Sequence, residues 1–344
     1  MGTQKAIELQ GEPGNVKLVT DRRLPRHRPG YVIVDVKAVA LNPTDWKHVD
    51  YHNTKGALAG CDFAGVVAET GDGYTKDWKV GDRIAGIVHG GNQLELEDGA
   101  FAERIAVRAD IGFRIPNSLS FEEASTLGVG IITVAQGLFQ QMGLSWPNKP
   151  SSSADFILIY GGSSATGTLG IQFAKLAGYR VISTSSKHNF ELVTSLGAEA
   201  AFDYKDPDVT DQIKKYTNGN LKYVWDTIAL PPTAKICAGV ISPGGTYGSI
   251  LNVEFPRDDV KKTFSLGYTA MGEPVKKWAF EVKDTTADFE FMKKWVKEIV
   301  DPLLAEGRIK VHPTRVSQGL DKVFEGFDLM RHDKVSGQKL VYTL

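Results

Sequence analysis

The chain has 344 residues, of which 42 % are hydrophobic and 24 % are charged, the composition of an ordinary globular protein. Its 40 basic and 41 acidic residues give a formal net charge of −1, which excludes recruitment of nucleic acid or an anionic membrane by an overall field. Two cysteines, Cys61 and Cys237, exclude a disulfide framework and favour a reducing compartment. The sequence shows no secretory h-region and no apolar run approaching about 18 residues, so we expect a cytoplasmic protein.

The first part of the chain, residues 1 to 125, reads as short strands separated by turns. Apolar and polar residues alternate along these segments, which indicates half-buried strands. Gly71-Asp72-Gly73 and Gly81-Asp82 supply turn residues, so this part predicts a barrel-like or sandwich-like β module. The strand segments are GNVKLVT, GYVIVDVKAVALN, DFAGVVAET, DRIAGIV and FAERIAV.

A helical period follows in FEEASTLGVGIITVAQGLFQQMG, where apolar residues lie three and four apart. After the linker-like segment Asn148 to Asp155, apolar strand segments alternate with helical lengths. Strands joined by helices imply right-handed crossovers and a doubly wound parallel sheet covered on both faces, hence an α/β fold. The expected strands are DFILIY, RVIST, AAFDY, YVWDTI and GTYGSI.

The last part of the sequence, from VHPTRVSQ onward, contains an amphipathic helix and a final strand, QKLVYTL. We expect this strand to return to the N-terminal β module. The first domain would then be discontinuous in the sequence.

A turn rich in glycine and hydroxyl residues, YGGSSATGTLG, follows the apolar strand DFILIY. Gly161-Gly162 and Thr166-Gly167 would leave backbone N–H groups and the positive end of the next helix available to a pyrophosphate, and Ser163, Ser164 and Thr166 add hydroxyl donors. The spacing differs from G-x-G-x-x-G, and a tight turn without a ligand is the alternative. The strand and helix units that follow favour a dinucleotide site.

The end of the second strand of this unit indicates which dinucleotide binds. An NAD site usually has an acidic residue about 20 residues beyond the first glycine, but STSSKHN stands here and the first acid is Glu191. Ser186, Lys187 and His188 offer hydroxyl and basic groups for a 2′-phosphate, which favours NADPH. Lys187 as a solvated surface lysine is the alternative, and Tyr204 either flanks the adenine or is a half-buried residue at a strand end.

Several further motifs occur in a specific order along the chain. They are VALNPTDWK, GCDFAGVVAETG, VGDRIAG, GAFAERIAV, the glycine turn and SGQKLVYTL. Taken together they resemble the medium-chain dehydrogenase/reductase superfamily over essentially the whole chain. The resemblance implies a GroES-like β-rich catalytic domain, residues 1–125 with 305–344, and a Rossmann domain, residues 126–304, that binds the dinucleotide.

The resemblance also bears on zinc. Zinc-dependent members have a cysteine, a histidine and a third cysteine or histidine where this chain has Asn42, Cys61 and Val129, so only one of three ligands is present. Two cysteines cannot form the four-cysteine structural zinc lobe. His48 and His52 stand four apart and could share a metal, but the sequence offers no third ligand. We expect no metal and interpret Cys61 as a small core residue.

Within the superfamily the chain is most similar to zinc-less members, and among them to the trans-acting enoyl reductases that partner fungal polyketide synthases, the lovastatin type. The shared segments are NPTDWK, GGSSAT, SKHNF, FDY and SGQKLV. The resemblance implies NADPH-dependent reduction of an enoyl thioester on the acyl carrier domain of a polyketide synthase or a PKS-NRPS, by a monomeric enzyme. A stand-alone quinone or alkenal reductase is the alternative, and a non-catalytic NADPH-binding protein is a further one.

The reaction implied by the resemblance adds hydride to the β-carbon of the thioester, so negative charge collects on the thioester oxygen. Lys47 is the candidate for stabilising or protonating that centre, although a lysine lying beside Trp46 is the alternative. Thr133 is a second candidate that competes with a capping role, and Asp45 is expected to orient its neighbours. The proton donor stays open.

The resemblance to the family assigns binding roles to the remaining candidate residues by their positions in the sequence. The cofactor-binding residues are expected to be Thr44, Asp45, Trp46, Lys47, Gly162, Ser163, Ser164, Ala165, Thr166, Gly167, Ser186, Lys187, His188, Asn189, Tyr204, Ser249, Ile250, Leu251, Val335 and Ser336. The substrate-binding residues are expected to be Gly128, Val129, Gly130, Ile131, Ile132, Thr133, Val134, Ala135, Thr269, Ala270, Met271, Gly272 and Glu273.

Overall fold

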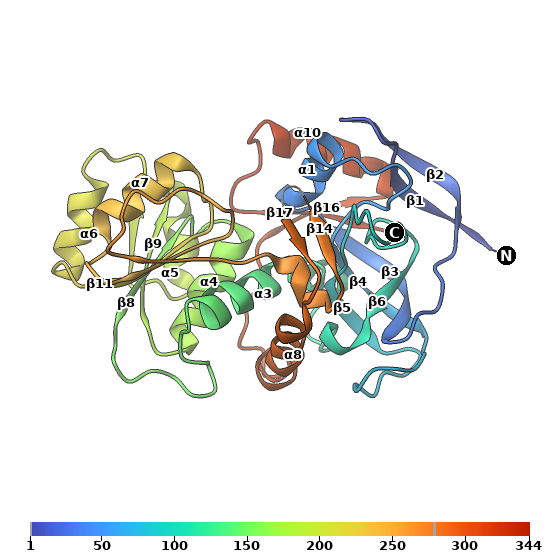
Figure 1. Ribbon diagram of the computed structural model, residues 1–344, viewed down its shortest axis with the longest axis horizontal. Helices are drawn as coiled ribbons and strands as arrows, with labels where there is room; N and C mark the ends of the chain where they lie inside the picture. The colour runs from blue at the N-terminus through green and yellow to red at the C-terminus, as the bar shows by residue number, and fades with distance from the viewer. Residues whose placement is uncertain (1, 278–279) are drawn as a thin grey trace. The chain divides into compact units, whose positions relative to one another are not determined.

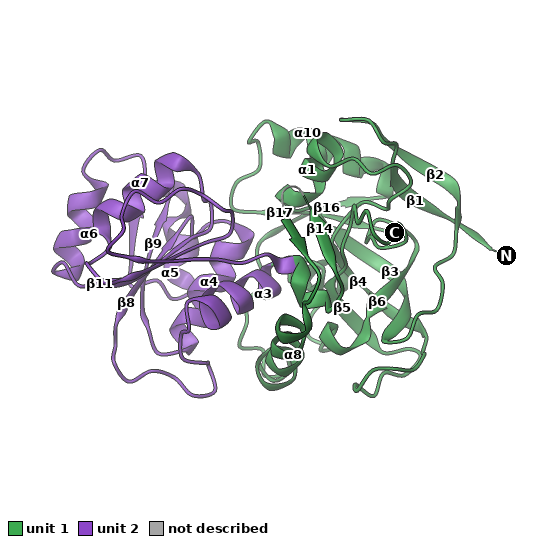
Figure 2. Ribbon diagram, viewed as in Figure 1, with its two compact units in different colours: residues 1–129, 268–344 green, residues 130–267 purple. Residues whose placement is uncertain are grey.

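The computed structural model describes residues 2–277 and 280–344. The chain folds as two compact units: unit 1 contains residues 1–129 and 268–344, and unit 2 contains residues 130–267 (Figure 2). The expected domain boundaries, 125/126 and 304/305, therefore differ from the unit boundaries, 129/130 and 267/268. The larger difference arises because residues 268–304, which follow the last strand of unit 2, pack with unit 1.

Unit 1 is built on a mixed sheet with the order β16-β17-β3-β4-β5-β7, in which β6 pairs with β3 (Figure 1). The C-terminal strand lies inside this sheet, antiparallel to β3 and parallel to β16, so the expected return of QKLVYTL to the N-terminal module is confirmed. The strands are β3 (Tyr31–Ala40), β4 (Asp62–Glu69), β5 (Arg83–Ile87), β6 (Arg104–Arg108), β7 (Phe113–Arg114), β16 (Thr314–Gln318) and β17 (Lys339–Thr343).

Two small antiparallel hairpins and several helices complete unit 1 (Figure 1). Helices α1 and α10 lie side by side, and Arg331 of α10 binds the carboxylate of Asp50 of α1 at 2.6 and 2.8 Å. The hairpins are β1 (Thr3–Leu9) with β2 (Val16–Arg23) and β14 (Val275–Lys277) with β15 (Phe280–Val282). The helices are α1 (Pro43–Tyr51), α2 (Phe121–Ala124), α8 (Thr286–Trp295), α9 (Asp301–Ala305) and α10 (Val323–Arg331), with a π-helical turn η5 (Val296–Val300) between α8 and α9.

Unit 2 contains a parallel sheet with the order β10-β9-β8-β11-β12-β13, which is the doubly wound order 3-2-1-4-5-6. The alternation of strand and helix after Asp155 predicted this sheet, and the structure confirms it. The strands are β8 (Phe156–Tyr160), β9 (Arg180–Ser185), β10 (Ala200–Asp203), β11 (Leu221–Asp226), β12 (Thr246–Ser249) and β13 (Lys261–Phe264).

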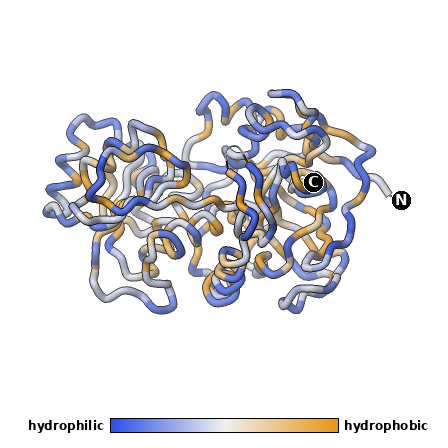
Figure 3. Tube along the Cα trace, viewed as in Figure 1, coloured by the Kyte–Doolittle hydropathy of each residue, from blue (hydrophilic) through white to orange (hydrophobic). Residues whose placement is uncertain are grey.

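The helices of unit 2 connect these strands and bury apolar residues against the sheet. Leu158 and Tyr160 of β8 belong to one core with residues of α6 and α7, such as Ile213 and Cys237. Apolar segments run through the strands, whereas the outer helix α6 and its neighbouring turns are mostly hydrophilic (Figure 3). The helices are α3 (Gly128–Val134), which begins in unit 1, α4 (Ala165–Leu176), α5 (Phe190–Ser195), α6 (Val209–Thr217) and α7 (Pro231–Val240), with a π-helical turn η2 (Ala135–Gln141) after α3.

The helices of the two units are short. Over the part of the chain that the structure describes, none has the length and hydrophobicity that crossing a bilayer would require.

Candidate active site

The glycine-rich turn of unit 2 joins the end of β8 to the start of α4. Gly161 has φ of +75°, which favours glycine, and a side chain at Gly162 would place its Cβ 1.9 Å from Oγ of Ser183. The Ser164 hydroxyl accepts a hydrogen bond from the Gly167 N–H at 2.9 Å and so caps α4. Ala165 opens the first turn of the helix, where backbone N–H groups lack intrahelical acceptors. The local geometry therefore fits an anion.

The serine hydroxyls of this turn differ in their surroundings. Besides capping α4, Ser164 Oγ lies 3.0 Å from Oγ1 of Thr227, so this hydroxyl has two partners within the protein. Ser163 and Thr166 are partly exposed. Of the three expected hydroxyl donors, Ser164 thus has a structural task in the protein, and Ser163 and Thr166 are the better candidates for contact with a phosphate.

The residues that are expected to bind the 2′-phosphate lie immediately after β9. Lys187 and His188 are exposed on a short 3₁₀ turn, and Ser186 is partly exposed and donates to the Tyr204 hydroxyl at 3.4 Å. Lys187 also contributes to lowering the pKa of the exposed Asp206 carboxyl, after larger contributions from two hydrogen bonds. Ser186 and Lys187 follow β9 and Tyr204 follows the adjacent strand β10, so these residues lie at neighbouring strand ends. The segment 186–190 contains basic and hydroxyl residues but no acidic residue.

The expected nicotinamide-side residues of unit 2 lie at the end of β12. The Ser249 hydroxyl donates to the Leu251 carbonyl at 2.8 Å, and the N–H of Ile250 donates to the Asp226 carbonyl at 3.3 Å. A cavity of about 510 Å³ lies beside Ser249 and is lined also by Phe255 and other residues of the segment 252–264, but not by the glycine turn.

In unit 1, the NPTDWK segment forms the start of α1. Asn42 occupies the N-cap position, and the Asp45 carboxylate accepts the Asn42 N–H at 2.7 Å, which completes a capping box. Asp45 is fully buried, and burial is the largest cause that raises its pKa to about 7. Asp45 therefore orients the first turn of α1 through its hydrogen bond with Asn42. Burial also brings the pKa of this carboxyl close to neutral pH.

Lys47 and Trp46 are both partly buried on α1. Lys47 Nζ lies 5.7 Å from the centroid of the Trp46 ring, and burial lowers the pKa of this lysine. The two sequence interpretations are therefore compatible: the lysine lies beside Trp46, and its ammonium gives up a proton more readily than that of a solvated lysine.

The three positions that bind catalytic zinc in zinc-dependent relatives do not fit a zinc ion here. Asn42 offers an amide, Val129 offers no donor atom in its side chain, and Cys61 is the single thiol. The Lys339 ammonium occupies the same region, 2.5 Å from Oδ2 of Asp62 and 3.0 Å from Oδ1 of Asn42. Because a fixed cation already neutralises Asp62, this arrangement disfavours a zinc ion at these positions.

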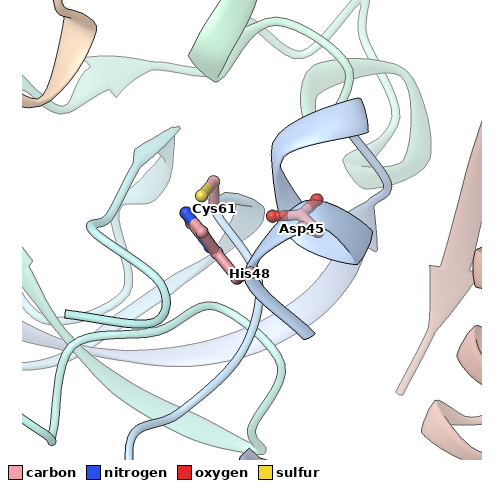
Figure 4. Close-up of side chains that lie close together, drawn as sticks. All are labelled: Asp45, His48 and Cys61. Atoms are coloured by element: carbon pink, nitrogen blue, oxygen red, sulfur yellow. The ribbon is translucent and has the colours of Figure 1, made fainter. Parts of the chain in front are cut away.

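A second group of side chains, Asp45, His48 and Cys61, has ligand atoms within 4.8 Å of one another and could hold a metal ion by geometry alone (Figure 4). Burial raises the pKa of the Cys61 thiol and lowers that of His48, and the nearby Asp45 carboxylate adds to the rise for the thiol. The fully buried amine of Lys277 acts electrostatically on all three residues. Metal binding would require the Cys61 thiol to lose its proton, which burial disfavours.

The structure adds Tyr268 and His89 to this polar group, and the sequence reasoning did not find them. The Tyr268 hydroxyl lies 2.6 Å from Oγ1 of Thr44 and 3.9 Å from Sγ of Cys61. The ring of His89 stacks on that of Tyr268 with 4.2 Å between centroids, and Lys277 Nζ lies 3.4 Å from the Tyr268 centroid. The available signal was that Tyr268 immediately precedes the expected substrate segment 269–273.

The expected substrate segments fall on both sides of the unit boundary. Residues 128–134 form α3, and Thr133 is partly exposed in unit 2, whereas Ile131 and Ile132 are buried. In unit 1, Glu273 accepts the Tyr31 hydroxyl at 2.5 Å and Thr269 donates to Asp288.

The remaining expected residues are also accounted for. In unit 1, Val335 packs against the core, and Ser336 is exposed just before β17. In unit 2, Asn189 is buried on the 3₁₀ turn after β9.

Comparison with known proteins identifies both parts of the chain. Residues 28–117 match the family described as alcohol dehydrogenase GroES-like domain, and residues 165–272 match the family described as zinc-binding dehydrogenase. The second description implies a metal, but the family positions discussed above lack the ligands for it.

Similar proteins include several fungal enzymes. The trans-enoyl reductase resD of Aspergillus sclerotiorum is 44 % identical over 348 residues, which cover 96 % of this chain and 97 % of that protein. The trans-enoyl reductase TOXD of Cochliobolus carbonum is 50 % identical over 274 residues, which cover 79 % of this chain and 92 % of that protein. The trans-enoyl reductase ACTTS2 of Alternaria alternata is 42 % identical, and the match covers 100 % of both chains.

Solved structures share the fold. The CurK enoyl reductase has a TM-score of 0.77 at 20 % identity, covering 99 % of both chains. The quinone oxidoreductase from Coxiella burnetii has a TM-score of 0.73 at 23 % identity, covering 100 % of both chains. The expected GroES-like and Rossmann architecture is thereby confirmed, and the chain is an oxidoreductase that belongs to the trans-enoyl reductases of the medium-chain dehydrogenase/reductase superfamily.

Proposed function

We propose that the protein is an NADPH-dependent trans-acting enoyl reductase of secondary metabolism. It reduces the C=C bond of an α,β-unsaturated polyketide thioester that a separate polyketide synthase or PKS-NRPS presents on its acyl carrier domain. The names of the relatives support the enoyl substrate and the trans-acting mode. The observation that carries the choice of cofactor is the end of β9, where Ser186, Lys187 and His188 replace the acidic residue typical of an NAD site.

The residues of unit 2 fit a dinucleotide with a 2′-phosphate. The first turn of α4 would bind the pyrophosphate through backbone N–H groups, with Ser163 and Thr166 as hydroxyl donors. Lys187 would bind the 2′-phosphate, and Tyr204, which is 38 % exposed, would flank the adenine. When bound, the dinucleotide supplies the hydride that adds to the β-carbon of the substrate.

The residues of unit 1 and α3 would act on the charge that develops on the substrate. As the β-carbon accepts hydride, the electron pair of the C=C bond moves toward the thioester oxygen, and a proton must then add to the α-carbon. Lys47, whose pKa burial lowers, would donate a hydrogen bond to that oxygen, and Thr133 would be a second donor. Asp45 would hold the start of α1 in place through its capping hydrogen bond with Asn42.

This chemistry requires no metal. The hydride acceptor is already activated by conjugation with the thioester carbonyl, and donors aimed at the oxygen supply the electrostatic stabilisation. The ammonium of Lys339 beside Asp62 supports a reaction without zinc at the family positions.

The surface and the cysteines of the protein bear on its assembly and compartment. Strand β13 is the last strand of the unit 2 sheet and exposes Lys261 and Lys262, which disfavours pairing of this edge with a second copy. We therefore propose a monomer.

Cys61 and Cys237 are both buried free thiols, which suits a reducing compartment such as the cytoplasm.

The decisive experiment measures nucleotide oxidation at 340 nm with NADPH and with NADH, using 2-alkenoyl and 2-methyl-2-alkenoyl pantetheine thioesters. The proposal predicts turnover of the thioesters and a strong preference for NADPH. Fast reduction of free quinones or alkenals without turnover of thioesters would reassign the protein as a stand-alone reductase. Tight NADPH binding without hydride loss to any of these acceptors would instead indicate a non-catalytic protein.

The role of Lys47 is tested with the same assay. Lys47→Met retains the stem beside Trp46 but removes the donor, so kcat should fall by about 10²-fold, as expected when one oxyanion donor is lost. Full retention of kcat would remove this role from Lys47 and leave the enzyme assignment intact.

A further inference from the structure

Tyr268 is held in unit 1 by polar and aromatic contacts on several sides. Its side chain is 8 % exposed, and its hydroxyl lies 2.6 Å from Oγ1 of Thr44 and 3.5 Å from Nε2 of His48. The stacked ring of His89 lies with its plane 28° from that of Tyr268. These contacts fix the orientation of the phenol, and either hydroxyl can donate in the hydrogen bond between Tyr268 and Thr44.

The position of Tyr268 in the sequence and in space connects it to both expected ligands. It directly precedes the segment 269–273, which the family resemblance assigns to the substrate. Its hydrogen-bond partner Thr44 belongs to the NPTD segment, which the resemblance assigns to the cofactor. The Tyr268 hydroxyl therefore adjoins one segment that the resemblance assigns to the substrate and one that it assigns to the cofactor.

The other acidic groups of unit 1 near Tyr268 are less suited to giving a proton to carbon. The Asp45 carboxylate accepts the capping N–H of Asn42, and Asp45 and Cys61 are both fully buried, whereas Tyr268 is 8 % exposed. Tyr268 has a pKa that burial raises well above the usual value for tyrosine, so it retains its proton throughout the neutral range. A phenol is still far more acidic than the α C–H of a thioester, so transfer of its proton to an enolate carbon is favourable.

We propose that Tyr268 is the general acid that protonates the α-carbon of the substrate after hydride addition. This inference rests on the proposed function. The O–H bond of Tyr268 breaks, the enolate electron pair forms the new C–H bond at the α-carbon, and the thioester carbonyl is restored. In one concerted transfer, the Thr44 hydroxyl gives its proton to the phenolate as the partly exposed Thr44 takes one from solvent, so that no alkoxide forms and the net proton comes from solvent.

The proposal also accounts for Lys277. Its Nζ lies 3.4 Å from the centroid of the Tyr268 ring, and this side chain is fully buried. Negative charge on the phenolate favours the protonated form of a lysine at this distance. The amine is thus placed to balance the charge that Tyr268 acquires transiently.

The test compares Tyr268→Phe with wild type, using 2-methyl-2-alkenoyl pantetheine, NADPH and its 4-deuterated form, in H₂O and in D₂O. Phenylalanine keeps the ring that stacks on His89, so the fold and the Kd for NADPH should be unchanged. We expect kcat to fall by about 10²-fold or more. Protonation should become rate-limiting, so the isotope effect from deuterated NADPH should approach unity and the solvent isotope effect should rise. The α-centre should form as a mixture of both configurations.

Matched variants separate a catalytic role from a structural one. Tyr216→Phe makes the same chemical change on α6 of unit 2, at a side chain that is 39 % exposed, and should behave as wild type. Thr44→Val keeps Tyr268 but removes its proton partner, so it should slow turnover while the α-centre keeps one configuration. If Tyr268→Phe were unstable, this variant would still test the relay.

Two results would overturn the proposal, and they can be distinguished. If wild type turns over the thioester and Tyr268→Phe keeps its kcat and a single α configuration, Tyr268 is not the acid, and the proposed function stands. If wild type turns over no enoyl thioester, the proposed function and the role of Tyr268 both fall.

Discussion

Lys339 and Asp62 form an ion pair in the interior of unit 1, with 2.5 Å between Nζ and Oδ2. The lysine side chain is 3 % exposed and the aspartate side chain is fully buried. The second oxygen of Asp62 accepts the N–H of Val129 at 2.6 Å, so this carboxylate connects the start of β17 with the beginning of α3. In this chain a tethered ammonium thus neutralises the carboxylate beside the positions where related enzymes bind zinc.

Replacement of this lysine should destabilise the protein strongly. Lys339→Met leaves the Asp62 charge in a dry interior without its cation, which typically costs about 3–5 kcal/mol of unfolding free energy. Urea denaturation measures this loss. The double variant Lys339→Met with Asp62→Asn should regain a large part of it, because no buried charge remains, and a loss equal to that of the single variant would contradict the argument.

Removal of metal should leave the activity unchanged. Asn42 and Val129 supply no zinc ligands, and burial disfavours the loss of the Cys61 proton that metal binding to the cluster of Asp45, His48 and Cys61 would require. Elemental analysis of the purified protein should find no stoichiometric zinc, and turnover should persist after dialysis against a chelator. A stoichiometric metal that disappears in a His48→Ala variant would place an ion in that cluster and refute this expectation.

The sequence predicted the large features of the fold because each depends on a local pattern. Alternation of strand and helix after Asp155 predicted the parallel sheet of unit 2, and the glycine turn lies where the apolar strand ends. The long helical period in the segment 121–143 predicted helix but not its division into α2, α3 and the π-helical turn η2. Such breaks depend on packing around the chain, which periodicity does not record.

The polar cluster of unit 1 could not be predicted in full because its members are distant in the sequence. The sequence indicates His48 as a possible metal ligand and Cys61 as a small core residue, but Tyr268 and Lys277 reach them only through the tertiary fold. Similarly, the family motif contains Lys339 in SGQKLV, yet its partner Asp62 is 277 residues away. Single-sequence patterns carry no information about such pairs.

The choice of NADPH should depend on Lys187. Lys187→Glu removes the cation proposed to bind the 2′-phosphate and introduces repulsion, so the Kd for NADPH should rise by roughly 10–100-fold, the size of one charge-assisted hydrogen bond. The Kd for NADH should change little. Quenching of protein fluorescence measures both constants, with Lys215→Ala on the exposed side of α6 as the control. An equal loss for the two nucleotides would argue against a 2′-phosphate contact.

The buried amine of Lys277 should make stability depend on pH. Burial lowers its pKa well below the usual value, whereas in the unfolded chain it titrates at about 10.4. Between these two values the unfolded state binds one proton more, so the free energy of unfolding should rise as pH rises toward about 10.

Replacing this lysine should remove that pH dependence. Lys277→Met fills the same space without an ionisable group, so folding no longer requires release of a proton and stability at neutral pH should also rise, by about 1–3 kcal/mol. Thermal melting at several pH values measures both effects. The neighbouring Lys276 is exposed, and Lys276→Met should change neither quantity. Identical pH profiles for wild type and Lys277→Met would contradict the burial of this amine.

Two substitutions, made singly and together, should test how closely the glycine turn packs against Ser183 of β9. Gly162→Ala would place a Cβ 1.9 Å from Oγ of Ser183, a side chain that is itself fully buried and donates to the Ile159 carbonyl. The turn must then shift, so NADPH binding should weaken and stability should fall by about 1–3 kcal/mol, the usual cost of overpacking. Ser183→Ala removes the obstructing oxygen, so the double variant should bind NADPH better than Gly162→Ala alone. Isothermal titration calorimetry and thermal melting of the three variants give the coupling free energy between Gly162 and Ser183. Additive effects of the two substitutions would show that the turn does not pack against the Ser183 hydroxyl.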